Sequence, residues 1–216
     1  MSLRVWKHCT EPDRMLKRLD PKTHRRKWVL FNCACCRRIW DRLPDDACRT
    51  YVEAVERYAL GTFKKKDLPP LKRAVDEAMW ESMRLSGPGH FEAANAASTV
   101  INTTRFSAWN AARAVGPRAR VAHRRERHAQ ADLLREIFWN TFRGIAVQPA
   151  WLTWNEGTVE RLARAILNEG NFDCLPILAD ALEDAGCNQA EILAHCRGLG
   201  PHVRGCGVVD LLLGKV

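Results

Sequence analysis

The sequence has no apolar run long enough to cross a membrane. A membrane-spanning helix needs about 18 or more uninterrupted apolar residues, and no stretch of the 216 residues approaches that length. The first residues, Met1–His8, also have no apolar core of the kind found in secretion signals. We therefore expect a cytoplasmic protein that has no membrane partner.

The strict alternation of apolar and polar residues that marks half-buried strands is absent throughout the chain. Apolar residues recur at helical spacing instead, and hydrophobic residues make up 46% of the sequence, enough to bury a core. This composition excludes intrinsic disorder for most of the chain. We predict an all-α protein, a multi-helix bundle with a C-terminal module of short helices.

No catalytic or nucleotide-binding motif is present. The glycine-rich stretch Gly198–Gly207 has neither the spacing of a phosphate-binding loop nor a strand before it. We interpret it as a structural turn that His202 and Arg204 fasten to nearby carbonyls; an anion held by its backbone amides is the alternative. His195 and Cys196 are neighbours on a predicted helix and point about 100° apart, so they form no dyad. We expect a protein that is not an enzyme.

The sequence has nine cysteines, an odd number. Cys33, Cys35 and Cys36 fall within one predicted helix, where they cannot easily meet the geometry of a disulfide. We expect reduced thiols and no disulfide-stapled secreted scaffold. The helical pattern explains these positions as core residues, although a metal cluster that includes His8 and Cys9 is the alternative.

Helical spacing and breaking residues divide the chain into segments. The first long segment has apolar residues on two faces, one with Trp28 and Ile39 and the other with Val29 and Trp40, so we expect a central helix packed against at least two others. Helices are predicted at about 20–43, 51–60, 71–85, 91–115, 116–142, 158–169, 175–185, 188–197 and 208–213.

Charge divides the chain into two regions of opposite sign. Residues 1–143 hold 29 basic and 16 acidic side chains, whereas residues 144–216 hold 5 and 9. We predict a domain boundary near Gly144, between a basic helical bundle at 1–143 and a compact, mildly acidic helical module at 144–216.

One predicted helix has a strongly basic first half in which Glu126 is the only acidic residue. At 100° per residue its positive charge nearly encircles two turns. The planar fork of arginine suits phosphate, and several such contacts give salt-sensitive, sequence-independent binding. The leading hypothesis is therefore an accessory protein that contacts the nucleic-acid backbone, of DNA or RNA, through Arg118, Arg120, Arg124, Arg125 and Arg127.

Two other interpretations of this region stay open. The arginines can be a solvated helix end that only keeps the protein in solution. The chain is then a protein-interaction adaptor or scaffold, and an exposed Trp- or Ala-rich surface between Phe91 and Val115 docks the partner.

A third hypothesis is a small structural zinc site, because thiolate and imidazole are ligands that zinc prefers. A C-x8-C-x5-H-x3-C pattern is formed by Cys187, Cys196, His202 and Cys206. A helix between the first two cysteines would separate them by roughly 13 Å, too far for one ion. The remaining candidate ligands are Cys196, His202 and Cys206, with His195 or Cys174 as a fourth. We nevertheless expect no cofactor, because buried thiols and a histidine that braces the loop also explain these residues, and zinc is the alternative.

Three segments resemble an uncharacterised bacterial protein family. They are Leu30–Trp40 (LFNCACCRRIW), Trp151–Thr158 (WLTWNEGT) and the C-terminal stretch Leu175–Lys215, with its strings LPILADALEDAGC, ILAHCR, PHVRGC and VDLLLGK. The resemblance covers both ends of the chain and implies a helical fold. It implies no activity.

Overall fold

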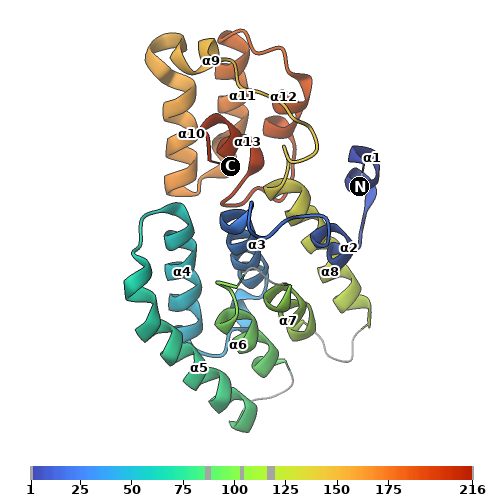
Figure 1. Ribbon diagram of the computed structural model, residues 1–216, viewed down its shortest axis with the longest axis vertical. Coiled ribbons are helices and arrows are strands. Elements are labelled where there is room, and N and C mark those ends of the chain that lie inside the picture. The colour runs from blue at the N-terminus through green and yellow to red at the C-terminus, as the bar shows by residue number, and fades with distance from the viewer. Residues whose placement is uncertain (1, 86–88, 103–104, 116–119, 216) are drawn as a thin grey trace. The chain divides into compact units, whose positions relative to one another are not determined.

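The computed structural model describes residues 2–85, 89–102, 105–115 and 120–215. The regular structure of these residues consists of α-helices and short 3-10 turns, and no strand occurs among them (Figure 1). The prediction of an all-α, multi-helix fold is therefore confirmed. No helix in the described ranges is long and apolar enough to cross a membrane.

The chain forms two compact units. The N-terminal unit is His8–Ala131, and the C-terminal unit combines Met1–Lys7 with Asp132–Val216. The division falls inside helix α8 (Arg120–Ile137), whereas the charge pattern placed a domain boundary near Gly144. No local pattern in the sequence indicates that the first seven residues belong with the C-terminal unit.

The N-terminal unit is built around helix α3 (Arg25–Arg38). This helix packs against α4 (Asp46–Leu60), α6 (His90–Ser98) and α7 (Phe106–Ala114), as Figure 1 shows. It is buried on all sides from Lys27 to Cys36, which confirms the prediction of a central helix. Helices α2 (Pro12–Leu16) and α5 (Leu68–Leu85) and the first half of α8 complete the unit.

Helix α3 begins later than the sequence predicts. The carboxylate of Asp20 accepts hydrogen bonds from the backbone N–H of Lys22 (3.0 Å) and from the hydroxyl of Thr23 (2.6 Å). These bonds hold the chain in a local turn, because a short acidic side chain competes with helical hydrogen bonding near its own position. The helix starts only after this turn.

The predicted helix 91–115 is in fact two helices, α6 and α7. Their alanines, among them Ala94, Ala97 and Ala111, are fully buried, because small side chains let the two helices approach closely. The interpretation of this segment as an Ala-rich docking surface is therefore wrong. Phe106 and Trp109 on α7 do remain exposed.

The C-terminal unit contains α1 (Leu3–His8) up to Lys7, the second half of α8, and a series of short helices. Trp6 is buried and its ring lies 4.8 Å from that of Phe142. The short helices are α9 (Pro149–Thr153), α10 (Thr158–Glu169), α11 (Leu175–Asp184), α12 (Ala190–Arg197) and α13 (Gly207–Leu212).

The second half of α8 ends earlier than predicted, at Ile137 rather than at Phe142. The side chain of Asn140 donates to the carbonyl of Ile145 and accepts from its N–H, both at 2.9 Å. These bonds close a loop around Gly144, whose φ of +65° is the left-handed conformation that glycine adopts readily. The amide of Asn140 thus fixes a loop where the apolar pattern indicated more helix.

All nine cysteines lie in the described part of the chain, and none of them is in a disulfide. The thiols on α3 are fully buried, and burial raises the pKa of Cys36 to about 12. The pKa values of Cys33 and Cys35 are also raised by burial. The α3 cysteines are therefore neutral, packed side chains, as their helical spacing indicated.

Brief treatment of the folded protein with iodoacetamide is expected to alkylate Cys9 and Cys174, which are partly exposed. The thiols of Cys33, Cys35 and Cys36 should stay unmodified, because they are shielded and the thiolate is the reactive form. Peptide mass spectrometry measures both groups. In denaturant all nine should react, and equal rates in the folded protein would contradict the packing of α3.

Candidate functional site

The first half of α8 carries arginines that point away from the core. Arg120, Arg124 and Arg125 are exposed, and none of the three forms an ion pair with any carboxylate that the structure describes. Arg118, which the sequence grouped with them, lies outside the described residues. Three of the five predicted phosphate-binding arginines are thus unneutralised.

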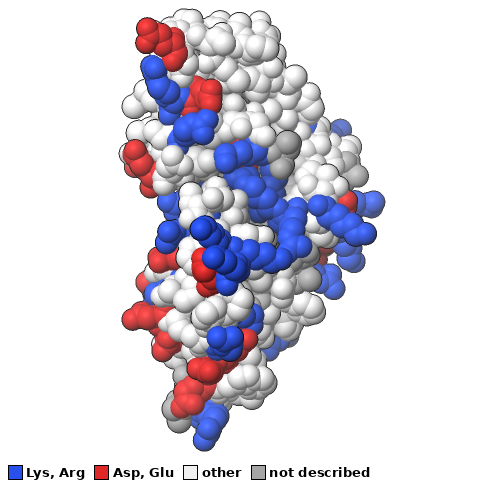
Figure 2. Space-filling view, turned by 60° about the vertical axis from the view of Figure 1, so that its left-hand side comes forward, with Lys and Arg blue, Asp and Glu red and all other residues white. Residues whose placement is uncertain are grey.

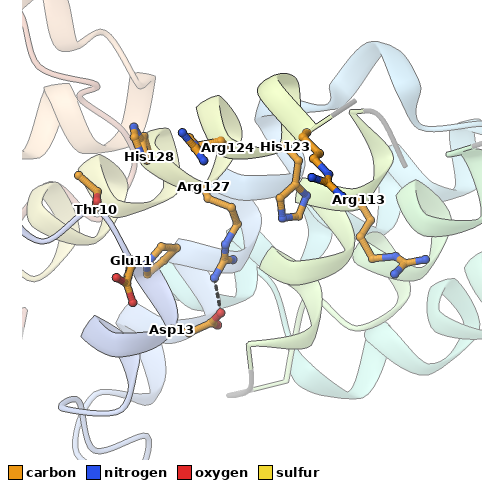
Figure 3. A pocket seen from close by; sticks show the side chains of 10 residues that line it. Thr10, Glu11, Asp13, Arg113, His123, Arg124, Arg127 and His128 are labelled. Carbon is orange, nitrogen blue, oxygen red and sulfur yellow. Dashed lines mark ion pairs between the residues drawn. The ribbon is translucent and has the colours of Figure 1, made fainter. Parts of the chain in front are cut away.

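Arg127 differs from these three arginines because it forms an ion pair with a carboxylate of the N-terminal unit. Its guanidinium lies 2.6 Å from the carboxylate of Asp13 and donates a second bond to Gln130 (2.7 Å), and its side chain is only 12% exposed. Figure 3 shows this ion pair as a dashed line. Arg127 therefore holds α8 against the segment that contains Asp13, and much of its charge is compensated.

The acidic residue of this segment, Glu126, faces inward. It is 5% exposed and accepts hydrogen bonds from Nε of Arg38 at 3.0 and 3.1 Å. Gln130, whose amide also donates to the carbonyl of Ala108 (2.8 Å), donates a further bond to Glu126. The only carboxylate within the arginine run is therefore used inside the N-terminal unit, and does not neutralise the arginines on the outer surface.

A pocket of about 840 Å³ lies beside this basic helix, against residues 10–13. Figure 3 shows the labelled side chains of α8 following one another along the pocket. Glu11 and Asp13 are its acidic members, and Asp13 is already paired with Arg127. The basic and histidine side chains that line it are Arg113, Arg120, His123, Arg124, Arg127 and His128.

Three residues that line this pocket were not among the predicted site residues, namely His123, His128 and Arg113. His128 lies four residues after Arg124, so helical spacing could have placed both on one face. His123 is held by a hydrogen bond from its Nδ1 to the carbonyl of Ala112 (3.1 Å), and Arg113 comes from α7. These two depend on how α7 packs beside α8, for which the sequence has no local signal.

A second basic surface lies where α3 begins and α4 ends. Nε of Arg26 donates to the carbonyl of Ala59 (3.0 Å) and so joins these two helix ends. Arg25 and the run Lys64–Lys66 are exposed. Figure 2 shows the Lys and Arg side chains, with Asp and Glu among them, on the side of the protein that it draws. The surface formed by Arg25 and Lys64–Lys66 carries exposed positive charge like the surface on α8, so substitutions in it can serve as a control for substitutions on α8.

A cluster of four metal-ligating side chains lies in the C-terminal unit: Glu136, His195, His202 and Cys206. Glu136 is in the last turn of α8, His195 is on α12, His202 is in the loop that follows, and Cys206 directly precedes α13. One ligand atom from each lies within 4.8 Å of all the others.

Three of the predicted zinc ligands lie together in this cluster. They are His202, Cys206 and His195, which the sequence offered as a possible fourth ligand. Cys196 is buried but does not belong to the cluster, since its side chain and that of His195 leave the helix about 100° apart. Cys174 is also outside. Glu136 was not predicted as a ligand. It lies 59 residues before His195 in the sequence, on a helix for which the sequence indicated only a buried apolar face.

The contacts within this cluster are short. Nε2 of His195 lies 3.2 Å from Sγ of Cys206 and 3.5 Å from Oε2 of Glu136, and Nδ1 of His202 lies 3.1 Å from Oε1 of Glu136. Burial by itself raises the pKa of Glu136, but hydrogen bonds to the two histidines lower it to about 2. Burial also raises the pKa of Cys206 well above its ordinary value.

The loop around His202 is fastened as the sequence indicated. Nε2 of His202 donates to the carbonyl of Gly198 (3.0 Å), and Arg204 donates to the carbonyl of Asn168 (3.3 Å). The interpretation of Gly198–Gly207 as a braced structural turn is confirmed by these bonds.

Comparisons with protein families, with curated proteins and with solved structures gave no match. The resemblance of the two ends of the chain to an uncharacterised bacterial family therefore stays a prediction. The chemistry of the two sites has to be argued from their own residues.

Proposed function

We propose that the protein is a non-enzymatic accessory protein that binds the phosphate backbone of nucleic acid through the first half of α8. The observation that carries this proposal is the state of Arg120, Arg124 and Arg125. All three are exposed and have no carboxylate partner in the described part of the chain, while Glu126 is turned inward to Arg38.

Three cations on two turns of one helix repel each other, and an external polyanion relieves that repulsion. Nucleic acid is such a polyanion, and the fork of each guanidinium can hold two phosphate oxygens. The neighbouring pocket adds His128 and Arg113 to this surface, although Arg113 is paired with Glu92 at 3.4 Å. A backbone-directed surface of this kind is sequence-independent, because it contacts phosphates and not base edges.

Binding should depend steeply on salt. Neutralising three phosphates releases their counterions, so the affinity is expected to fall by about 20-fold to 40-fold between 50 and 200 mM salt. Fluorescence anisotropy with labelled single strands and duplexes of arbitrary sequence measures this slope and compares the two forms of nucleic acid. The absence of binding at low salt would overturn the proposal.

The triple substitution Arg120→Ala, Arg124→Ala and Arg125→Ala is expected to weaken binding by about tenfold or more and to flatten the salt dependence. The matched control replaces Lys64–Lys66 by alanine, which removes the same charge from the other basic surface. The control should change affinity by less than about threefold. Equal losses would show that only net charge matters, and a larger loss in the control would assign binding to the lysine surface.

A protein-interaction adaptor is the second candidate, and the exposure of Phe106 (59%) and Trp109 (42%) on α7 favours it. Trp109 also contacts the guanidinium of Arg113 at 4.7 Å from its ring centre. The adaptor hypothesis predicts no nucleic-acid binding at low salt, so the same anisotropy experiment distinguishes the two candidates.

A further inference from the structure

The cluster in the C-terminal unit offers the ligand set of a zinc ion: one thiol sulfur, two imidazole nitrogens and one carboxylate oxygen. Ligand atoms around a tetrahedral zinc ion lie about 3.3 to 3.6 Å apart, as bond lengths of about 2.0 to 2.3 Å require. Nε2 of His195 lies 3.2 Å from Sγ of Cys206, and the two histidines approach different oxygens of Glu136, His202 at 3.1 Å and His195 at 3.5 Å. One ligand atom from each of the four residues lies within 4.8 Å of all the others. Side-chain rotations that shorten the longer separations are needed to complete the tetrahedron.

A backbone carbonyl orients one of the histidines. Nε2 of His202 donates its proton to the carbonyl of Gly198, which leaves Nδ1, 3.1 Å from Oε1 of Glu136, as the nitrogen that can coordinate a metal ion once its proton is displaced. Metal-bound histidines are commonly held by such a bond from the other ring nitrogen. The arrangement therefore places a coordinating nitrogen where zinc would lie.

The site is shielded but can be reached. Glu136 is 4% exposed, and the side chains of His195 and His202 are about nine-tenths buried. A surface pocket of about 380 Å³ is lined in part by Glu136 and His195, and gives an ion a path to the ligands. Buried charged groups need compensation, and a divalent cation supplies it.

We propose that Glu136, His195, His202 and Cys206 bind one Zn²⁺ ion. Four protein ligands fill a tetrahedral coordination sphere, so the ion is structural and leaves no position for a substrate. Binding displaces the thiol proton of Cys206. The ion joins the last turn of α8, helix α12, the loop after it and the start of α13 within the C-terminal unit.

The rival account has no metal. In it, His202 carries protons on both ring nitrogens and donates one to Gly198 and one to Glu136, which makes a buried ion pair. This account predicts that the protein neither retains nor takes up zinc.

Metal content decides between them. The full chain, free of any histidine tag and purified without chelator, is expected to contain about one zinc per chain by plasma mass spectrometry. After the metal is stripped, added ZnCl₂ should rebind at a ratio of one in competition with a chromophoric chelator. Protein that holds no zinc and takes up none from ZnCl₂ overturns the proposal.

Two matched cysteine variants test the ligand assignment. With Co²⁺ as a spectroscopic probe, wild-type protein should show a thiolate-to-cobalt charge-transfer band in the near ultraviolet. Cys206→Ser should abolish this band, whereas Cys196→Ser, which changes an equally buried thiol outside the cluster, should keep it. Loss of the band in Cys196→Ser alone would overturn the assignment.

His202→Ala is the second variant. It should lower bound zinc to less than about a fifth of an equivalent, because three ligands bind far more weakly than four. Far-UV circular dichroism reports whether each variant is folded. If neither ligand variant folds, the band is compared between the wild-type protein and Cys196→Ser. A band that Cys196→Ser keeps is assigned to Cys206, the thiol within the cluster, and the absence of any band in the wild-type protein overturns the proposal.

Discussion

Phe31→Ala is expected to lower the free energy of unfolding of the N-terminal unit by about 3 to 5 kcal/mol. Phe31 is completely buried on α3, the helix that contacts α4, α6 and α7. Truncation removes the transfer free energy of the ring and leaves a cavity that helices on several sides cannot close together. Urea unfolding followed by circular dichroism measures the change.

Phe106→Ala is the matched control, since it makes the same chemical change in the same unit at a side chain that is 59% exposed. Its effect should stay within about 0.5 kcal/mol, as for surface substitutions without a buried partner. A Phe31→Ala variant as stable as Phe106→Ala would contradict the central position of α3.

Gly207→Ala is expected to lower the free energy of unfolding of the C-terminal unit by about 3 kcal/mol or more. An added Cβ would lie 2.5 Å from Cβ of Trp139 and 3.0 Å from the backbone of both Glu136 and Trp139. Backbone atoms cannot rotate away, so α13 must shift as a whole. Because Cys206 directly precedes this helix, the proposed zinc affinity should also fall.

Gly200→Ala controls for the added methyl group. The new Cβ would meet only the ring of His202 at 3.4 Å, an ordinary contact, and Gly200 has no positive φ. Its stability should change by less than about 1 kcal/mol. Thermal unfolding of the two alanine variants side by side measures the difference, and equal melting temperatures would mean that α13 does not pack on Trp139 as described.

Helix positions were predictable where the local pattern and the packing agree. Helix α10 occupies the residues that the sequence predicted, 158–169, because its apolar stripe is buried and Gly170 can take a φ of +74° after its last turn. The predicted helix at 91–115 was wrong because alanine favours a helix anywhere. Only the packing of α6 on α7 decides where that alanine-rich stretch turns.

The basic site was predictable only in part. The sequence shows a run of arginines with one acidic residue, but helical spacing cannot tell which arginine finds a carboxylate. Arg127 reaches Asp13, which is more than a hundred residues earlier in the chain, and Glu126 pairs with Arg38. Such pairs are made by the packing of distant segments, so they are absent from any local pattern.

The sequence by itself determined the helical class, the central position of the cysteine-rich helix and the excess of positive charge before residue 143. These follow from side-chain periodicity and composition, which act locally along the chain. Only the tertiary structure decided that the first seven residues pack with the C-terminal unit, and that Glu136 joins His195, His202 and Cys206. Contacts between distant segments depend on how whole helix faces fit together, and no single segment encodes that fit.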